Sequence, residues 1–163
     1  SSLISRSYSK QYSIAGLRAG YVICSEDIIK EMEKLALFTT MYPSSIVQFA
    51  IAEQKNNMEY FINDARQIMK ERMELLYNGF NGIDGLSCNK AEGGLYIWLN
   101  CMGVEEDDKV FADRMLKNAK VAIVPGSCFG ESGKGFLRVS LGADKEKICE
   151  AIKRIKEEIC NGK

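Results

Sequence analysis

Lys10 stands in a stretch of sequence whose side chains could bind and react with a small phosphorylated carbonyl compound. Residues 3–6 read Leu-Ile-Ser-Arg and are typical of the end of a β-strand, so Lys10 follows the tip of a strand. The lysine amine is a potential Schiff-base nucleophile. The hydroxyls of Ser7 and Ser9 and the guanidinium of Arg18 are donors suited to a phosphate. These residue types are also common in solvated loops, so their spacing alone leaves open an ordinary surface loop.

The order of residues from 7 to 21 carries more information than their spacing. It reads S-x-S-K-x-Y-x-x-x-G-x-R-x-G-Y, which resembles the lysine motif of the class I/II aminotransferases, fold-type-I enzymes that use pyridoxal 5′-phosphate. A second segment, V-A-I-V-P-G-S-C-F-G at residues 121–130 and G-F-L-R-V-S at residues 135–140, resembles the small-domain segment of the same family. The two motifs occur in the family's order, and the resemblance covers essentially the whole chain.

The resemblance implies roles for side chains of both motifs. Lys10 would form the Schiff base with the cofactor and then act as the base that moves the substrate's α-proton. Ser7 and Arg18 would bind the cofactor phosphate. Arg138 would bind the α-carboxylate of the amino-acid substrate in a bidentate manner.

The environment of Arg138 is predicted from its apolar neighbours. Phe136, Leu137, Val139 and Leu141 surround it, which indicates a buried position on a strand. The alternative is a side chain that points to the solvated face of the strand or pairs with a carboxylate.

Composition excludes several classes of function. The chain has 163 residues, of which 46% are hydrophobic, and its 22 Lys and Arg balance its 22 Asp and Glu, so we expect no nucleic-acid partner. No apolar run approaches the roughly 20 residues of a membrane span, so we expect no membrane partner, and we expect no secretory signal. The chain has no histidine, and its six cysteines form no C-x-x-C pair, so we expect no metal site and no Ser-His-Asp catalysis. We expect a cytoplasmic protein with reduced thiols.

The order of elements predicts an α/β fold, the C-terminal part of the fold-type-I transferase fold. Residues 1–57 would be a remnant of the large cofactor-binding domain, residues 58–82 an interdomain helix, and residues 83–163 the small domain. Ser25 is expected to begin a helix that ends before Pro43, and Asp144 to cap a final helix. Apolar periodicity predicts further helices over about 45–54, 59–80 and from 107 or 108, and strands over 86–88, 95–99, 121–124 and 136–141.

The start of the chain bears on activity. Lys10 is preceded by only nine residues, whereas family members carry a long segment ahead of this motif. We therefore expect a C-terminal piece without the carboxylate that meets the pyridine nitrogen, and hence a chain that is inactive by itself.

The function predicted for the parent protein is transfer of an amino group from an amino acid to a 2-oxo acid, by a homodimer that uses pyridoxal phosphate. One alternative is a β-carbon–sulfur lyase of the same fold, which would use Lys10, Arg18 and Arg138 equally well. Another is that the chain is a non-catalytic structural fragment or a dimerisation module.

Overall fold

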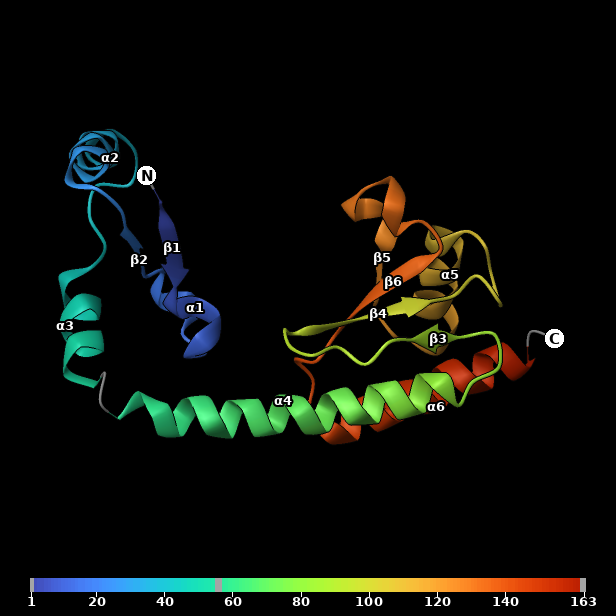
Figure 1. The fold of residues 1–163 in the computed structure, drawn as a ribbon. Helices are drawn as coiled ribbons and strands as arrows, with labels where there is room; N and C mark the ends of the chain where they lie inside the picture. Colours follow the sequence, from blue (N-terminus) through green and yellow to red (C-terminus); the bar gives the residue numbers. More distant parts are fainter. Residues whose placement is uncertain (1, 55–56, 162–163) are drawn as a thin grey trace. The chain divides into compact units, whose positions relative to one another are not determined.

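The structure, a computed structural model, describes residues 2–54 and 57–161, which form two units (Figure 1). The first unit is Ser1–Arg66 and the second is Gln67–Lys163. The boundary between the units falls inside the long helix α4, Met58–Asn81. The presence of α4 confirms the helix predicted over 59–80.

The first unit begins with a two-stranded antiparallel ladder. Strand β1, Ile4–Ser7, pairs with β2, Gly20–Ile23, so that Ser7 lies opposite Gly20. The connection between the strands holds a single helical turn, α1 (Tyr8–Gln11), and a 3-10 turn, η1 (Ala15–Leu17). Helices α2 (Glu26–Thr39) and α3 (Ser45–Gln54) follow.

Helix α2 begins after Ser25 and ends before Pro43, as expected. It stops at Thr39 because Met41 adopts a positive φ of 58°, a conformation that cannot continue a right-handed helix. Among the described residues of the first unit, none is buried, so the hydrophobic core lies in the second unit.

The second unit is built on an antiparallel sheet with strand order β3-β4-β6-β5. These strands are β3 (Ser87–Cys88), β4 (Tyr96–Asn100), β5 (Val124–Pro125) and β6 (Phe136–Ser140). Helix α5 (Asp108–Arg114) continues into a π-helical turn, η2 (Met115–Ala119), and η3 (Gly126–Phe129) and η4 (Glu131–Gly133) are 3-10 turns. The chain's last described helix is α6 (Lys145–Asn161).

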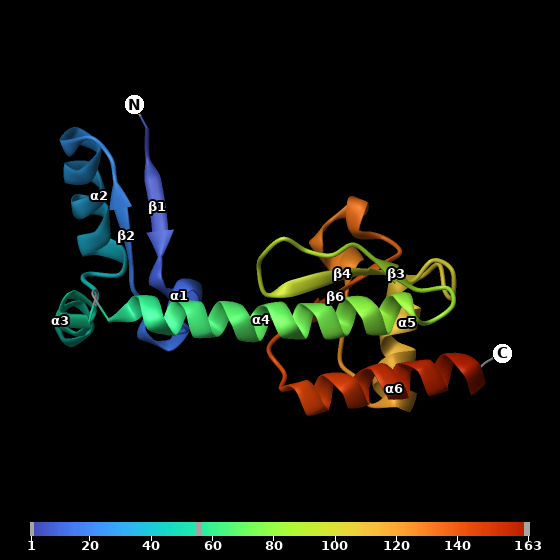
Figure 2. The same cartoon turned by 60° about the horizontal axis from the view of Figure 1, so that its bottom comes forward.

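Helices α4 and α6 pack against each other within this unit. Figure 2 shows α6 running beside the C-terminal part of α4, and a Cβ added at Gly79 would come within 2.6 Å of the Ile152 side chain. Ile148, Ile155 and Ile159 are buried, and the Asp144 carboxylate accepts a hydrogen bond from the N–H of Lys147 at 2.9 Å, which confirms the predicted cap and apolar stripe.

The strand predicted over residues 121–124 is wrong in its bounds and its burial. Only Val124 of that range is in β5, and its side chain is half-buried. Lys120 ends the π-helical turn with φ 58°, and the N–H of Val121 donates to the carbonyl of Met115. Residues 120 and 121 therefore belong to the end of a helical turn, and their backbone groups are not available for strand pairing.

Candidate functional site

Ser7 and Lys10 lie where β1 passes into α1. The side-chain oxygen of Ser7 accepts a hydrogen bond from the N–H of Ser9 at 3.2 Å, so Ser7 caps the turn that carries Lys10. Lys10 is in the last turn of α1, and its side chain is exposed. The N–H of Tyr8 donates to the carbonyl of Ala19 at 3.2 Å, which closes the connection next to the ladder.

Arg18 lies at the other end of the same connection. Its backbone is left-handed, with φ 52° and ψ 48°, at the end of η1, two residues before Gly20. One guanidinium nitrogen, Nη1, donates to the carbonyl of Ala15 at 2.9 Å, and the side chain is exposed. Because Ser7 pairs with Gly20, the ladder holds Ser7 and the Arg18 segment at one end of the two strands.

A tyrosine cluster that the sequence analysis missed holds this connection. The ring of Tyr8 lies 5.5 Å from that of Tyr12 and 5.4 Å from that of Tyr21, measured between centroids. Burial, and then the neighbouring Tyr21, raise the pKa of Tyr8. The spacing of Tyr8 and Tyr12 on one helical turn was a visible signal, whereas the contact with Tyr21 depends on the strand pairing.

Arg138 lies on the face of the second unit's sheet that is opposite the core. Its neighbours on β6, Leu137 and Val139, are buried, whereas Arg138 is half-buried. The prediction that Arg138 is buried is therefore wrong, because successive side chains of a strand alternate between faces. Trp98 of β4 is its direct partner in the ladder.

Aromatic rings surround the Arg138 guanidinium. Its Cζ lies 4.3 Å from the ring centroid of Tyr96 and 4.6 Å from that of Phe129, within the range of cation–π attraction. The ring of Trp98 lies 5.8 Å from that of Phe129, edge-on, and 6.2 Å from that of Phe136, stacked.

Arg138 forms no ion pair with any residue in the ranges 2–54 and 57–161. Arg154, by contrast, pairs with Glu150 at 2.8 Å. A half-buried guanidinium that has aromatic neighbours and no carboxylate partner among the described residues has donors in a planar fork available for an external anion, and a carboxylate matches that fork.

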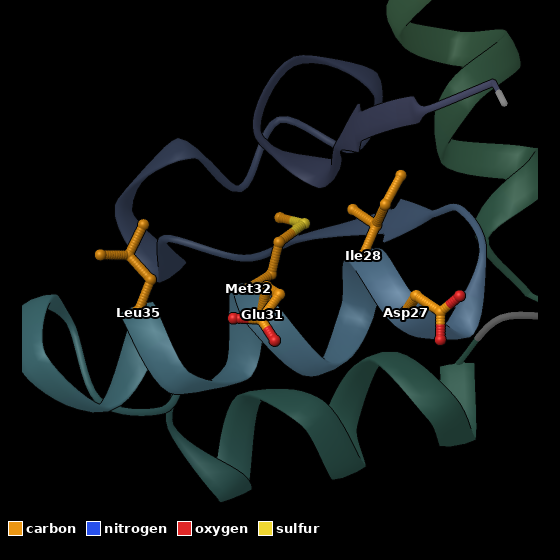
Figure 3. Close-up of a pocket in the computed structure, with 5 residues that line it drawn as sticks. All are labelled: Asp27, Ile28, Glu31, Met32 and Leu35. Carbon is orange, nitrogen blue, oxygen red and sulfur yellow. The ribbon is translucent and has the colours of Figure 1, made fainter.

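The pocket beside α2 has a different character. Its volume is about 430 Å³, and its lining, projecting from one side of α2 (Figure 3), consists of Asp27, Ile28, Glu31, Met32 and Leu35. None of the predicted site residues lines it. Its charged lining residues are both acids, which is unsuited to a phosphate, so we do not assign the cofactor to it.

The predicted site residues are divided between the two units. Ser7, Lys10 and Arg18 share one connection in the first unit, and Arg138 lies in the second. Within the part of the chain that the structure describes, no group of three or more His, Cys, Asp or Glu side chains is placed to hold a metal ion. No helix there has the length and apolar character of a membrane span.

Comparisons with known proteins agree on one family. The family described as "Aminotransferase class I and II" matches residues 1–155. The aspartate aminotransferase of Pyrococcus horikoshii is 28% identical over 159 residues, with 96% of this chain and 41% of that protein covered. That of Bacillus subtilis is 36% identical over 154 residues, with 91% of this chain and 38% of that protein covered.

Solved structures show the same likeness. The aromatic aminotransferase from Pyrococcus horikoshii superposes with a TM-score of 0.93 at 29% identity, covering 98% of this chain and 43% of that one. The aspartate aminotransferase from Rhizobium meliloti gives a TM-score of 0.84 at 31% identity, covering 97% and 42%. The chain thus spans about two fifths of the length of these relatives and has a partial, mixed α/β fold-type-I aminotransferase structure. The chain belongs to the class I and II aminotransferase family.

Proposed function

We propose that this chain is the C-terminal part of an aminotransferase that moves an amino group from an amino acid to a 2-oxo acid. The family's cofactor is pyridoxal 5′-phosphate. The first unit would belong to the cofactor-binding domain, α4 would join the domains, and the rest of the second unit would be the small domain.

The observation that carries the proposal is the single connection between β1 and β2, which bears an amine, a hydroxyl and a guanidinium. This donor set fits an aldehyde that carries a phosphate. The hydroxyl oxygen of Ser7 accepts a hydrogen bond from the N–H of Ser9, so the hydroxyl hydrogen of Ser7 remains available to a phosphate oxygen. Arg18 uses Nη1 on the Ala15 carbonyl and has further N–H groups for the same anion.

Each residue has a defined task under this proposal. When bound, the cofactor supplies an electron sink for the substrate's α-carbon. Lys10 would hold the cofactor aldehyde, and its amine, once free, would accept and return a proton at Nζ. Ser7 and Arg18 would bind the phosphate, and Arg138 would bind the substrate carboxylate.

The test is covalent labelling of the chain with substoichiometric pyridoxal phosphate, followed by borohydride reduction and peptide mapping. We expect the label on Lys10, its loss in Lys10→Ala and its retention in Lys30→Ala. Lys30 is a suitable control because it is an exposed lysine of the same unit, paired with Glu26 at 2.8 Å. Label spread evenly over surface lysines, or kept in Lys10→Ala, would refute the role of Lys10.

A second measurement isolates the phosphate contact. Arg18→Gln removes the charge of the guanidinium, so labelling by pyridoxal phosphate should weaken, while labelling by pyridoxal, which has no phosphate, should not change. Equal loss with both compounds would mean that Arg18 acts on the shape of the loop and not on the phosphate.

A further inference from the structure

The Arg138 guanidinium is flanked by one aromatic ring from each side of its strand. β6 lies between β4 and β5 in the sheet. Tyr96 comes from β4, and Phe129 ends η3, the turn that directly follows β5. Arg138 itself pairs with Trp98 on one side and with Val124 on the other. The sheet therefore delivers both rings to a single side chain from segments that are distant in sequence.

These two rings are not part of the hydrophobic core. Tyr96 is 41% exposed, on the face of β4 that turns away from the buried Ile97 and Leu99, and Phe129, at the end of η3, is 52% exposed. Replacing them with leucine would leave the core untouched. Their contact with Arg138 can therefore be tested apart from the stability of the unit.

An aromatic ring meets a guanidinium over its flat face, whereas the N–H groups of the guanidinium point outward along its edge. A ring contact therefore restricts the side chain without using the donors that a carboxylate needs. The contact at Phe129 is itself supported, because Trp98 lies edge-on to that ring. The N–H of Ser127, in the same turn, is bound by the buried carboxylate of Asp108 at 2.8 Å.

We propose that Tyr96 and Phe129 are positioning residues, whose rings hold the Arg138 guanidinium ready to bind a carboxylate. The carboxylate role of Arg138 rests on the proposed function, whereas the ring contacts do not. The rings act through Arg138 and are not catalytic residues. Because the contact is made by the rings, the hydroxyl of Tyr96 is not required for it.

The experiment follows the guanidinium signal of Arg138 by NMR in the whole chain during titration with acetate, with chloride at equal ionic strength as a control. Arg138→Lys assigns the signal. Tyr96→Leu and Phe129→Leu each remove a ring, and Tyr96→Phe and Phe129→Tyr keep it. We expect the leucine variants to lose part of the ring-current shift of Arg138 and to bind acetate about two- to fivefold more weakly. The ring-keeping variants should match the original chain in both.

The outcomes separate the two ideas. Acetate binding and a ring-current shift that both survive in the leucine variants would overturn the positioning role alone. An Arg138 signal that acetate does not move in any variant would overturn the carboxylate role and with it the positioning, even where the ring-current shift shows the contact to be present. Should Tyr96→Leu fail to fold, Phe129→Leu, on a surface turn, decides the question.

Discussion

Asp108 offers a prediction about the support of the Arg138 site, because it joins α5 to the turn that carries Phe129. It is the only buried charged residue among those described, with 3% of its surface exposed. Its Oδ2 accepts a hydrogen bond from the N–H of Ser127 at 2.8 Å. Asp108→Ala would remove this charged acceptor and leave the N–H of Ser127 without its hydrogen bond to the carboxylate. A hydrogen bond to a charged group contributes about 1.5–3 kcal/mol, so we expect the free energy of unfolding to fall by about 2–3 kcal/mol. Asp108→Asn keeps an amide oxygen that can accept, and should cost about 1 kcal/mol.

The pH dependence follows from the direction of the pKa shift. Burial by itself raises the pKa of Asp108, but hydrogen bonding from the Ser127 main chain and other nearby groups outweighs it, and the pKa lies below the ordinary value of an aspartate. A carboxyl whose pKa is lower in the folded state stabilises the fold fully above its unfolded pKa, and this contribution is lost as the pH falls through the folded value. The free energy of unfolding of the original chain should therefore exceed that of Asp108→Asn by a constant amount above about pH 5. This excess should shrink below about pH 4.

The assay is urea denaturation of each variant at pH 7 and at intervals down to pH 3. Asp113→Asn is the matched control, since Asp113 is an exposed acid on the same helix and pairs with Lys117 at 2.6 Å on the surface. It should change the unfolding free energy by less than about 0.5 kcal/mol. A stability loss in Asp108→Ala no larger than that of Asp113→Asn, or a difference from Asp108→Asn that grows on acidification, would refute the reasoning.

Two further predictions concern backbone packing and thiol reactivity. A Cβ at Gly20 would lie 2.7 Å from the carbonyl oxygen of Arg6, so Gly20→Ala should lower the hydrogen-exchange protection of the amides in β1 and β2. Gly16→Ala is the control, because a Cβ there meets nothing within 4 Å, and it should leave this protection unchanged. Equal effects of the two substitutions would contradict the packing argument. Burial, followed by the nearby Asp108 charge, raises the pKa of Cys101 to about 11. Iodoacetamide at pH 8 should therefore alkylate the exposed Cys128 and spare Cys101, as measured by mass spectrometry of the peptides. Equal labelling of the two cysteines would contradict this prediction.

Helical elements were predictable because their signals are local. The isoleucines of α6 recur at the helical period, and Asp144 immediately precedes the first residue of the helix, so both the buried stripe and the cap could be located without tertiary information. The four apolar residues 121–124 carried no such period. A short apolar run is compatible with several structures, and here the end of the π-helical turn decided the backbone.

The sequence was enough to propose residues for the candidate site, but it did not contain their surroundings. Motif order led to the proposal of Ser7, Lys10 and Arg18, and the structure places these three residues on one connection between two strands. The alternation of side chains along β6 would have been enough to place Arg138 on the open face of the sheet. Its burial was mispredicted because the prediction used the residues next to it in sequence, which point to the opposite face. Phe129 and Tyr96 reach Arg138 only through pairings between distant segments, which no local pattern contains.

The Lys10 connection and the Arg138 strand, which lie in different units, depend on different kinds of support. The Lys10 connection rests on a two-stranded ladder in a unit where no described residue is buried, and an isolated ladder of that kind is marginally stable at best. Arg138 rests on a strand whose other face is packed into a core with exposures of 0% at Leu99 and Leu137. Order at Lys10 must therefore depend on burial or binding beyond the ladder itself, whereas order at Arg138 is supplied by its own unit. It follows that acetate binding at Arg138 can be measured without order at Lys10, so that the two proposed roles are tested independently of each other.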